Sequence, residues 1–435
     1  MRIVSLNAES KKELLRLLAS RSPEGYPEEE ARVLDIIARV RTERDTAVYD
    51  YTEQFDRVKV TAADVKVTRS EIDAAYEALD PAFIEVMKQA AKNIRIFHEK
   101  QKRNTWIDTK EDGSILGQRV LPLAISGVYV PGGKAAYPSS VLMNVIPAKV
   151  AGVERIIMTT PPSADPAYEK TAGIAPATLV AADIAGVTEV YRAGGAQAIA
   201  AMAFGTESIP KVDKITGPGN IYVALAKKAC FGHVSIDSIA GPSEILVLAD
   251  ETANARYVAA DLLSQAEHDE MASAILITTS KTLAEQVSAE VDGFLKTLER
   301  AEIIQKSLDA YGYIFVADTM AEAIDASNEI ASEHLEILTK DPFETMTKIK
   351  NAGAIFLGPY SSEPLGDYFA GPNHILPTNR TARFFSPLSV DDFIKKSSII
   401  SYSCDALKAV HKDIERFAHE EGLTAHENSI AVRFE

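Results

Sequence analysis

From about residue 120 onward, short β-branched or apolar runs alternate with segments of helical periodicity. The runs are ISGVYV, RIIMTT, EVYRAG, KITG, EILVLAD, AILITT, YIFVAD and AIFLG. This alternation is typical of βαβ units, which build a parallel sheet covered by helices. Because one set of runs precedes about residue 244 and another follows it, the sequence predicts an α/β protein with two Rossmann-like parallel-sheet domains.

The two ends of the chain have a different pattern. The amino terminus, MRIVSLNAESKKELLRLL, predicts a short strand and then a charged helix. Residues 9–103 have helical spacing of apolar residues, interrupted by Pro23, Gly25 and Pro27. From about residue 390 the pattern predicts helices again, ending in a polar tail that bears histidines. We therefore expect an extension at the amino terminus and a small domain at the carboxyl terminus.

Charge and cysteine content exclude several classes of protein. The chain has 46 Lys and Arg against 62 Asp and Glu, a formal charge of −16, so it lacks the basic surface that nucleic acid requires. No apolar run reaches the ~18 residues of a membrane span, and the amino terminus does not read as a secretion signal. Cys230 and Cys404 are far apart in sequence. We expect a cytoplasmic protein with free thiols and no membrane or nucleic-acid partner.

Three glycine-containing turns follow strands of the first set. They are Tyr129-Val130-Pro131-Gly132-Gly133, Gly194-Gly195-Ala196-Gln197 and Gly217-Pro218-Gly219-Asn220. Glycine lets a ligand approach the backbone at the carboxyl end of a parallel sheet, and the next helix favours an anion. Three such turns in succession favour a binding site for a nucleotide or phosphate over a purely structural role as tight turns. Since neither GxGxxG nor a Walker A loop is present, they do not specify a dinucleotide.

The eight histidines fall in few places. Gln265 and His268 are spaced i and i+3, so one helix face could present both to a metal ion, although a structural role is the alternative. Glu333 and His334 are adjacent, about 100° apart if helical. They would then do separate jobs, with the histidine as a general base, unless they are a surface pair.

Two further clusters lie nearer the carboxyl terminus. Glu363 and Asp367 occupy a Pro- and Gly-containing loop after the run AIFLG, and they are candidates for a metal ion or a cationic substrate group. Capping or turn formation is the alternative for both. The tail from His419 to Asn428 includes Glu421 and His426. Such a tail has either no role or an intermolecular one.

Taken in order, eight motifs resemble those of the histidinol dehydrogenase family. They run from roughly residue 30 to the end and include GVYVPGGKAAYPSSVLMN, RAGGAQAIAAMAFGT, KITGPGN, IDSIAGPSEILVLAD, DLLSQAEHD, SEHLEI, GDYFAGPNHILPT and LTAHENS. The resemblance implies an NAD-dependent homodimer with one zinc ion per subunit. It also implies oxidation of L-histidinol to L-histidine through L-histidinal, by two hydride transfers at the end of histidine biosynthesis.

The resemblance also implies roles for individual residues. It places zinc on Gln265, His268, Asp367 and His426, and acid/base chemistry on Glu333 and His334. It places NAD contacts on Tyr129, Gln197 and Asn220. It places substrate contacts on Ser243, Gln265, His268, His334, Glu363, Asp367, Glu421 and His426.

These roles imply a division of labour. His334 would remove the alcohol proton, and Glu333 would activate the water that hydrates the aldehyde. Zinc would orient the substrate rather than activate the alcohol, and Glu421 would lie near the substrate's amino group. The tail bearing Glu421 and His426 would cross to the other subunit, so that each active site is shared.

The family plan implies four parts, one of which is built from two segments of the chain. Residues 1–26 form the amino-terminal extension, without chemistry that we can identify. Residues 27–127 and 245–388 form the Rossmann-like domain with the metal and acid/base residues, and 128–244 form the domain with the NAD contacts. Residues 389–435 form the carboxy-terminal domain.

Three other functions compete with this interpretation. A related zinc- and NAD-dependent dehydrogenase of another small alcohol, such as a sulfonated diol, should lack residues directed at imidazole and amine. A zinc hydrolase would not explain the glycine turns. A nucleotide sensor should have lost the Glu333 and His334 pair.

Overall fold

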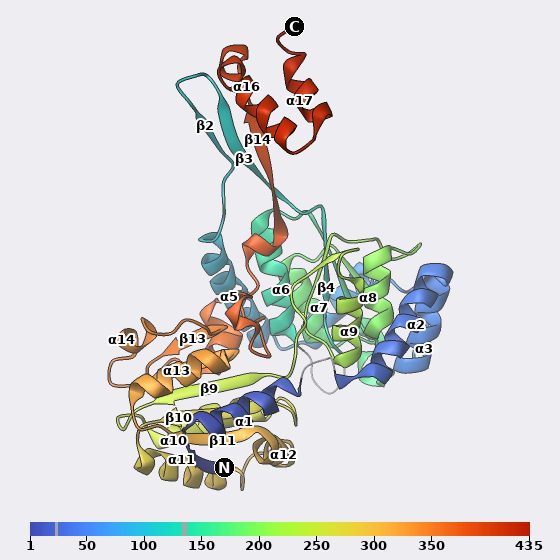
Figure 1. The fold of residues 1–435 in the computed structure, drawn as a ribbon. Helices are drawn as coiled ribbons and strands as arrows, with labels where there is room; N and C mark the ends of the chain where they lie inside the picture. Colours follow the sequence, from blue (N-terminus) through green and yellow to red (C-terminus); the bar gives the residue numbers. More distant parts are fainter. Residues whose placement is uncertain (22–24, 133–136) are drawn as a thin grey trace. The chain divides into compact units, whose positions relative to one another are not determined.

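The computed structural model describes residues 1–21, 25–132 and 137–435 (Figure 1). Pro23, one of the expected helix breakers, and Gly133 of the first glycine turn lie outside the described residues. The chain divides into two compact units. The first unit is Met1–Gln101 with Leu123–Phe393, and the second unit is Lys102–Pro122 with Ile394–Glu435.

A six-stranded parallel sheet lies in the first unit. Its spatial order is β1 (Arg2–Ser5), β11 (Gly312–Val316), β10 (Ser273–Thr278), β9 (Glu244–Ala249), β12 (His334–Leu338) and β13 (Ala354–Leu357). β1 therefore adds the amino-terminal extension to the edge of this sheet.

Helices cover both faces of this sheet, since successive residues of a strand point to opposite faces. In β9, Ile245 and Val247 pack with α10 (Ala255–Ala266), α11 (Lys281–Phe294) and α12 (Ala301–Tyr311). Leu246 and Leu248 pack on the other face with α1 (Ala8–Ala19) and α13 (Met320–Ile330), and the short α14 (Pro342–Met346) lies against β12. The buried strands are continuously apolar for this reason, as the sequence pattern predicted.

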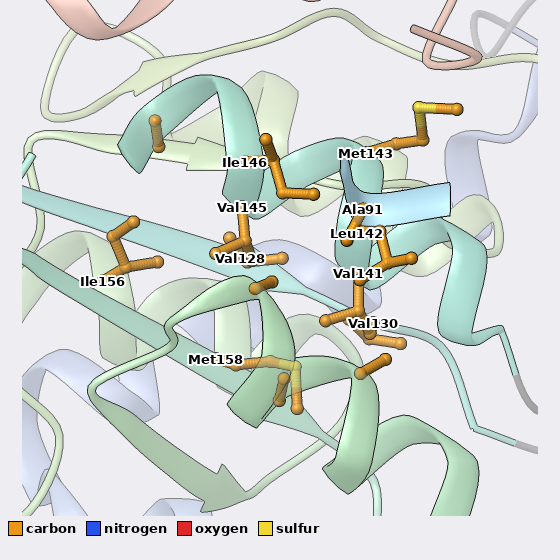
Figure 2. Close-up of a cluster of buried hydrophobic side chains, with 14 of the residues drawn as sticks. Ala91, Val128, Val130, Val141, Leu142, Met143, Val145, Ile146, Ile156 and Met158 are labelled. Carbon is orange, nitrogen blue, oxygen red and sulfur yellow. The ribbon is translucent and has the colours of Figure 1, made fainter. Parts of the chain in front are cut away.

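A five-stranded parallel sheet, also in the first unit, has the order β6-β5-β4-β7-β8. Its strands are β4 (Ile125–Tyr129), β5 (Arg155–Thr160), β6 (Glu189–Arg192), β7 (Lys214–Thr216) and β8 (Ser235–Ile236). Its helices are α6 (Pro138–Ala151), α7 (Pro176–Ala185), α8 (Gly195–Phe204) and α9 (Ile221–Cys230). Figure 2 shows part of its core, where Val128 and Ile156 of the strands face Val145 and Ile146 of α6. The two sheets confirm the predicted fold class.

Four helices lie between residues 27 and 99: α2 (Pro27–Glu43), α3 (Asp45–Asp56), α4 (Arg69–Ala78) and α5 (Pro81–Glu99). We expected residues 27–127 to join the domain of 245–388. In the structure, α2 packs on α8 and α9, α4 on α7, and α5 on α6, around the five-stranded sheet, while α5 also contacts Gly366–Ala370 of the segment 245–388. The end of the segment, from Lys102, lies in the second unit. Helical periodicity predicts a buried face but not the sheet that covers it. The domain boundaries as a whole stay a prediction.

The second unit combines an antiparallel sheet with two helices. The sheet has the order β14-β3-β2, formed by β14 (Ile394–Ser401), β3 (Ile115–Pro122) and β2 (Trp106–Thr109). The helices α16 (Cys404–Glu420) and α17 (Thr424–Ala431) pack on each other. The expectation of helix from about residue 390 is wrong for β14, because that strand is stabilised by pairing with β3, which lies far away in the sequence.

Short turns of helix connect these elements. They are α15 (Glu363–Leu365), a π-type turn labelled η3 (Gly366–Ala370), and the 3₁₀ turns η2 (Pro166–Thr171), η4 (Thr381–Arg383) and η5 (Val390–Phe393). Among the described residues, no helix has the length and apolarity that crossing a bilayer requires.

Candidate active site

A cavity of about 360 Å³ in the first unit collects most of the predicted site residues. It is lined by Ser243, Gln265, His268, Glu333, His334 and Asp367, and by the turn Gly217–Asn220. Ser243 and His334 stand at the amino ends of β9 and β12. The six-stranded sheet therefore contributes its amino edge, whereas ligands of open parallel sheets ordinarily lie at the carboxyl edge. The five-stranded sheet follows that rule, because the turn Gly217–Asn220 comes directly after β7.

His334 is buried, and its two ring nitrogens have different surroundings. Nδ1 lies 3.1 Å from the backbone carbonyl oxygen of Glu244. Since a carbonyl only accepts hydrogen bonds, Nδ1 carries the hydrogen and the lone pair is on Nε2. Nε2 has no hydrogen-bond partner among the described residues, and it lies 3.9 Å from Oδ1 of Asp367. Burial lowers the pKa of His334 to about 3, so the ring is neutral at pH 7 and presents a basic nitrogen.

Glu333 is also held by the backbone of Glu244. Its Oε2 accepts a hydrogen bond from the amide nitrogen of Glu244 at 2.9 Å, and the same oxygen lies 3.6 Å from Nδ1 of His334. Burial raises the pKa of Glu333 well above its usual range, and the nearby charge of Glu244 raises it further. We expected Glu333 and His334 to diverge as helical neighbours. His334 instead begins β12, directly after Glu333, and both side chains line the same cavity.

Three side chains form a cluster suited to a cation. Ligand atoms of His268, Glu363 and Asp367 all lie within 4.8 Å of one another. Burial raises the pKa of Asp367 to about 6. The pKa of Glu363 is raised to about 8, mainly by burial and secondly by the charge of Asp367. Without a cation, two buried carboxyl groups are difficult to ionise. A bound divalent ion would stabilise their ionised forms.

Gln265 adds an amide oxygen to the possible metal ligands that line the cavity. It lies in the last turn of α10, is 1% exposed, and its Oε1 has no partner among the described residues. His268 lies just beyond the end of α10, where its amide donates to the carbonyl of Gln265 at 3.2 Å. The i and i+3 spacing therefore brings both residues to one cavity across the helix end, rather than along a continuous helix.

Sequence reasoning assigned no role to two groups beside the carboxyl cluster, the buried Glu336 and the partly buried His374. Glu336 accepts a hydrogen bond from the amide of Glu363 at 2.8 Å, and His374 donates from Nδ1 to the carbonyl of Asp367 at 3.0 Å. Both anchor the backbone of the segment that bears Glu363 and Asp367. The alternation of β12, which puts Glu336 on the same side as His334, could have indicated the first. The motif GPNHILPT contains the second, but no spacing rule pointed to it.

The turn at Gly217 requires glycine. Its φ is +119°, and a Cβ there would lie 2.0 Å from the carbonyl oxygen of Tyr129. Its amide donates to Asp237 at 2.8 Å, and Asp237 pairs with the buried Lys227, which also donates to the carbonyl of Gly217 at 3.0 Å. Asn220 then caps α9. The amino end of a helix at the cavity wall favours an anionic ligand.

The other two predicted NAD contacts lie beside each other but not on this cavity. Tyr129 ends β4, and its hydroxyl accepts a hydrogen bond from the amide of Gly195 at 3.2 Å. Gln197 is buried in the first turn of α8, and its Oε1 has no partner among the described residues. Of the three predicted contacts, only Asn220 lines the cavity.

Glu421 and His426 belong to the second unit. Glu421 directly follows α16, and His426 lies in α17; both line a hollow of about 860 Å³ between these helices. The geometry of the first unit does not test their predicted roles.

Comparisons with known proteins place this arrangement in context. The sequence model of the family described as histidinol dehydrogenase matches residues 19–434. Histidinol dehydrogenase of Halalkalibacterium halodurans is 59% identical over 403 residues, covering 93% of each chain. That of Geobacillus kaustophilus is 58% identical over 412 residues, covering 94% of this chain and 95% of the relative. The crystal structure of histidinol dehydrogenase from Elizabethkingia anophelis superimposes with a TM-score of 0.93 at 38% identity, covering 100% of this chain and 98% of the other.

Proposed function

The chain belongs to the histidinol dehydrogenase family, and from this premise we propose that it oxidises L-histidinol to L-histidine with reduction of two NAD. The alcohol first loses a proton and a hydride to give L-histidinal. The aldehyde then takes up water, and the hydrate loses a second hydride and proton to give the carboxylate. The observation that carries the proposal is the free Nε2 of His334 facing a cavity whose other wall holds metal-type donors.

His334 is the proposed base for the alcohol. Its Nδ1–H is engaged by the carbonyl of Glu244, so Nε2 is the atom that accepts the proton. Burial keeps the ring neutral, which keeps the lone pair free before the substrate arrives.

Glu333 is the proposed group that activates water in the second step. The amide of Glu244 holds one of its carboxyl oxygens, and the residue lines the cavity. A cation at the neighbouring carboxyl cluster would favour the ionised form of Glu333, and the raised pKa makes that carboxylate a strong base for a water beside the bound aldehyde.

Gln265, His268 and Asp367 are the proposed metal ligands of the first unit, with His426 as the fourth. The unpartnered Oε1 of Gln265 and the close approach of His268 to Asp367 fit a divalent ion. When bound, one zinc ion per subunit would supply positive charge and open positions that orient the substrate's imidazole and amine. Glu363 is assigned to the substrate with Ser243 and Glu421, although it lies within the same cluster as His268 and Asp367.

Tyr129, Gln197 and Asn220 are the proposed contacts of NAD, which accepts the hydrides. The turn at Gly217 and the capped start of α9 support a phosphate-bearing ligand beside the cavity. We further propose that the tail with Glu421 and His426 completes the site of a second copy of the chain. Because the reaction draws on NAD and makes an amino acid, we place the enzyme in the cytoplasm.

The deciding experiment counts NADH against histidine with zinc-loaded protein and L-histidinol. We expect two NADH per histidine, with activity lost on chelation and restored by zinc. One NADH with released aldehyde would contradict the role of Glu333. No NADH from folded, metal-filled protein would overturn the substrate, and a panel of other amino and sulfonated alcohols would then be tested.

A further inference from the structure

We infer that Arg21, in the amino-terminal extension, is a positioning residue for Glu333 and His334 and acts on both through Glu244. This inference deepens the proposed function and rests on it. It assigns a role in the chemistry to a segment in which the sequence analysis identified none.

Arg21 lies just beyond α1, and its side chain is 0% exposed. Its Nη2 forms an ion pair with the carboxylate of Glu244, whose side chain is 3% exposed. Its Nη1 donates to the carbonyl oxygen of Met271 at 2.9 Å, and its guanidinium lies over the ring of Tyr311. Arg21 therefore joins the start of β9 to the loop that follows His268.

Glu244 is the first residue of β9, and its backbone contacts both proposed acid/base residues. Its amide holds Oε2 of Glu333 at 2.9 Å, and its carbonyl holds Nδ1 of His334 at 3.1 Å. The second contact determines which nitrogen of His334 is free. Any shift of Glu244 therefore moves the proposed water-activating group and the proposed base together.

Stability alone does not account for this ion pair. Burying two charges costs about as much as their attraction returns, and an apolar pair of similar volume is often as stable. Moreover, Nε of Arg21 and Oε2 of Glu244 have no partners among the described residues, so the pair is incompletely satisfied. What the pair does accomplish is to hold the Glu244 side chain inward, which sets the plane of the peptide groups that Glu333 and His334 contact.

The test compares steady-state kinetics of Arg21→Met, Arg21→Lys, Glu244→Gln and the double variant Arg21→Met/Glu244→Gln. Arg21→Met leaves a buried carboxylate without a counter-charge. Since misplacement by ~1 Å is worth up to ~100-fold in rate, we expect kcat to fall at least ~10-fold. KM for L-histidinol and for NAD should stay within ~3-fold, because the side-chain contacts of Arg21 with described residues are to Glu244, Met271 and Tyr311, none of which is a metal-type donor or part of a glycine turn. Arg21→Lys keeps the charge and should lose less.

The double variant tests the route through Glu244. Glutamine keeps the backbone of residue 244 but removes the stranded charge, so the double variant should recover part of the kcat lost in Arg21→Met. Lys214→Met is the matched control. Lys214 is 7% exposed, pairs with Asp392 at 3.0 Å, and opens β7 at the opposite end from the turn Gly217–Asn220. The variant Lys214→Met should lower the melting temperature without lowering kcat.

The inference is overturned if Arg21→Met keeps kcat within ~2-fold of the wild type, or if the double variant is no faster than Arg21→Met. It is also overturned if Lys214→Met lowers kcat as much as Arg21→Met does. Loss of any buried ion pair would then be enough to lower kcat. If Arg21→Met does not fold, Arg21→Lys and the double variant carry the same comparison. A wild type inactive with L-histidinol would contradict the proposed function instead. In that case a crystal structure of Arg21→Lys decides the inference, by whether Nδ1 of His334 leaves the carbonyl of Glu244.

Discussion

Carboxylate oxygens of Glu363 and Asp367 lie within 4.8 Å of each other, with a ring nitrogen of His268 in the same cluster. Burial, together with the charge of Asp367, raises the pKa of Glu363 to about 8, so this carboxyl group keeps its proton at neutral pH when no cation is bound. A cation bound at this cluster would displace that proton, so the pH of the solution and metal binding would be linked.

This linkage predicts how the stability of metal-free protein depends on pH. The folded-state pKa of Glu363 is raised, so its contribution is present below the ordinary pKa of a glutamate and is lost as pH rises through about 8. Between about pH 6.5 and 8 the unfolded histidines are largely neutral, so the carboxyl groups dominate. The melting temperature of metal-free protein should fall over this window, and Glu363→Gln should flatten the fall. The exposed Glu154→Gln is the control, and a matching change there would contradict the assignment.

Asp367 and Glu363 should differ in their effect on metal content. Asp367→Asn removes a proposed ligand and should weaken zinc binding at least ~10-fold. Glu363→Gln should keep the metal and raise KM for L-histidinol. Equilibrium dialysis with metal analysis measures the first, and steady-state kinetics the second. Loss of zinc in Glu363→Gln would make Glu363 a ligand, as its place in the cluster permits.

His334 and Glu333 should separate the two oxidations. His334→Ala removes the proposed base and should lower kcat for L-histidinol by ~100-fold or more. Glu333→Gln should spare the alcohol step and slow L-histidinal oxidation, because glutamine cannot take a proton from water. Single-turnover NADH formation from each substrate checks both. Equal losses with the two substrates in Glu333→Gln would disprove the division of labour.

Gly217→Ala should damage NAD binding. The new Cβ would meet the carbonyl oxygen of Tyr129 at 2.0 Å, at a φ of +119° that L-residues avoid. We expect Kd for NAD to rise at least ~10-fold, measured by titration calorimetry. Gly232→Ala is matched for backbone conformation, with a φ of +97°, but has nothing within 4 Å of the added Cβ. Equal NAD affinity of the two variants would show that the close approach of a side chain to the carbonyl oxygen of Tyr129 does not affect NAD binding.

Shared active sites predict complementation. Dimers that mix an inactive His426→Asn chain with an inactive His334→Ala chain should regain part of the activity, because one composite site has both groups intact. The measurement is the rate after co-expression and tandem purification of the mixed dimer. Verified mixed dimers without activity would contradict a tail that crosses between copies.

The acid/base pair shows what the local sequence can predict and what it cannot. Glu333 and His334 are identified by the motif SEHLEI, and their residue types indicate proton transfer. The motif does not reveal that one backbone, that of Glu244, holds both, since Glu244 is 90 residues from His334 in the chain. Arg21 is more distant still, 223 residues from Glu244, and no local pattern marks it as buried.

The sequence by itself determined the βαβ alternation, the helical amino-terminal region, the glycine turns and the family. Each of these depends on residue types and spacings within a few turns or strands, where steric and hydrophobic preferences act locally. Only the tertiary structure decided that α2, α4 and α5 pack around the five-stranded sheet, that residues 394–401 form a strand, and that the cavity opens at the amino edge of β9 and β12. These outcomes depend on contacts between segments far apart in the chain, and the free energy of such contacts cannot be predicted from a local pattern.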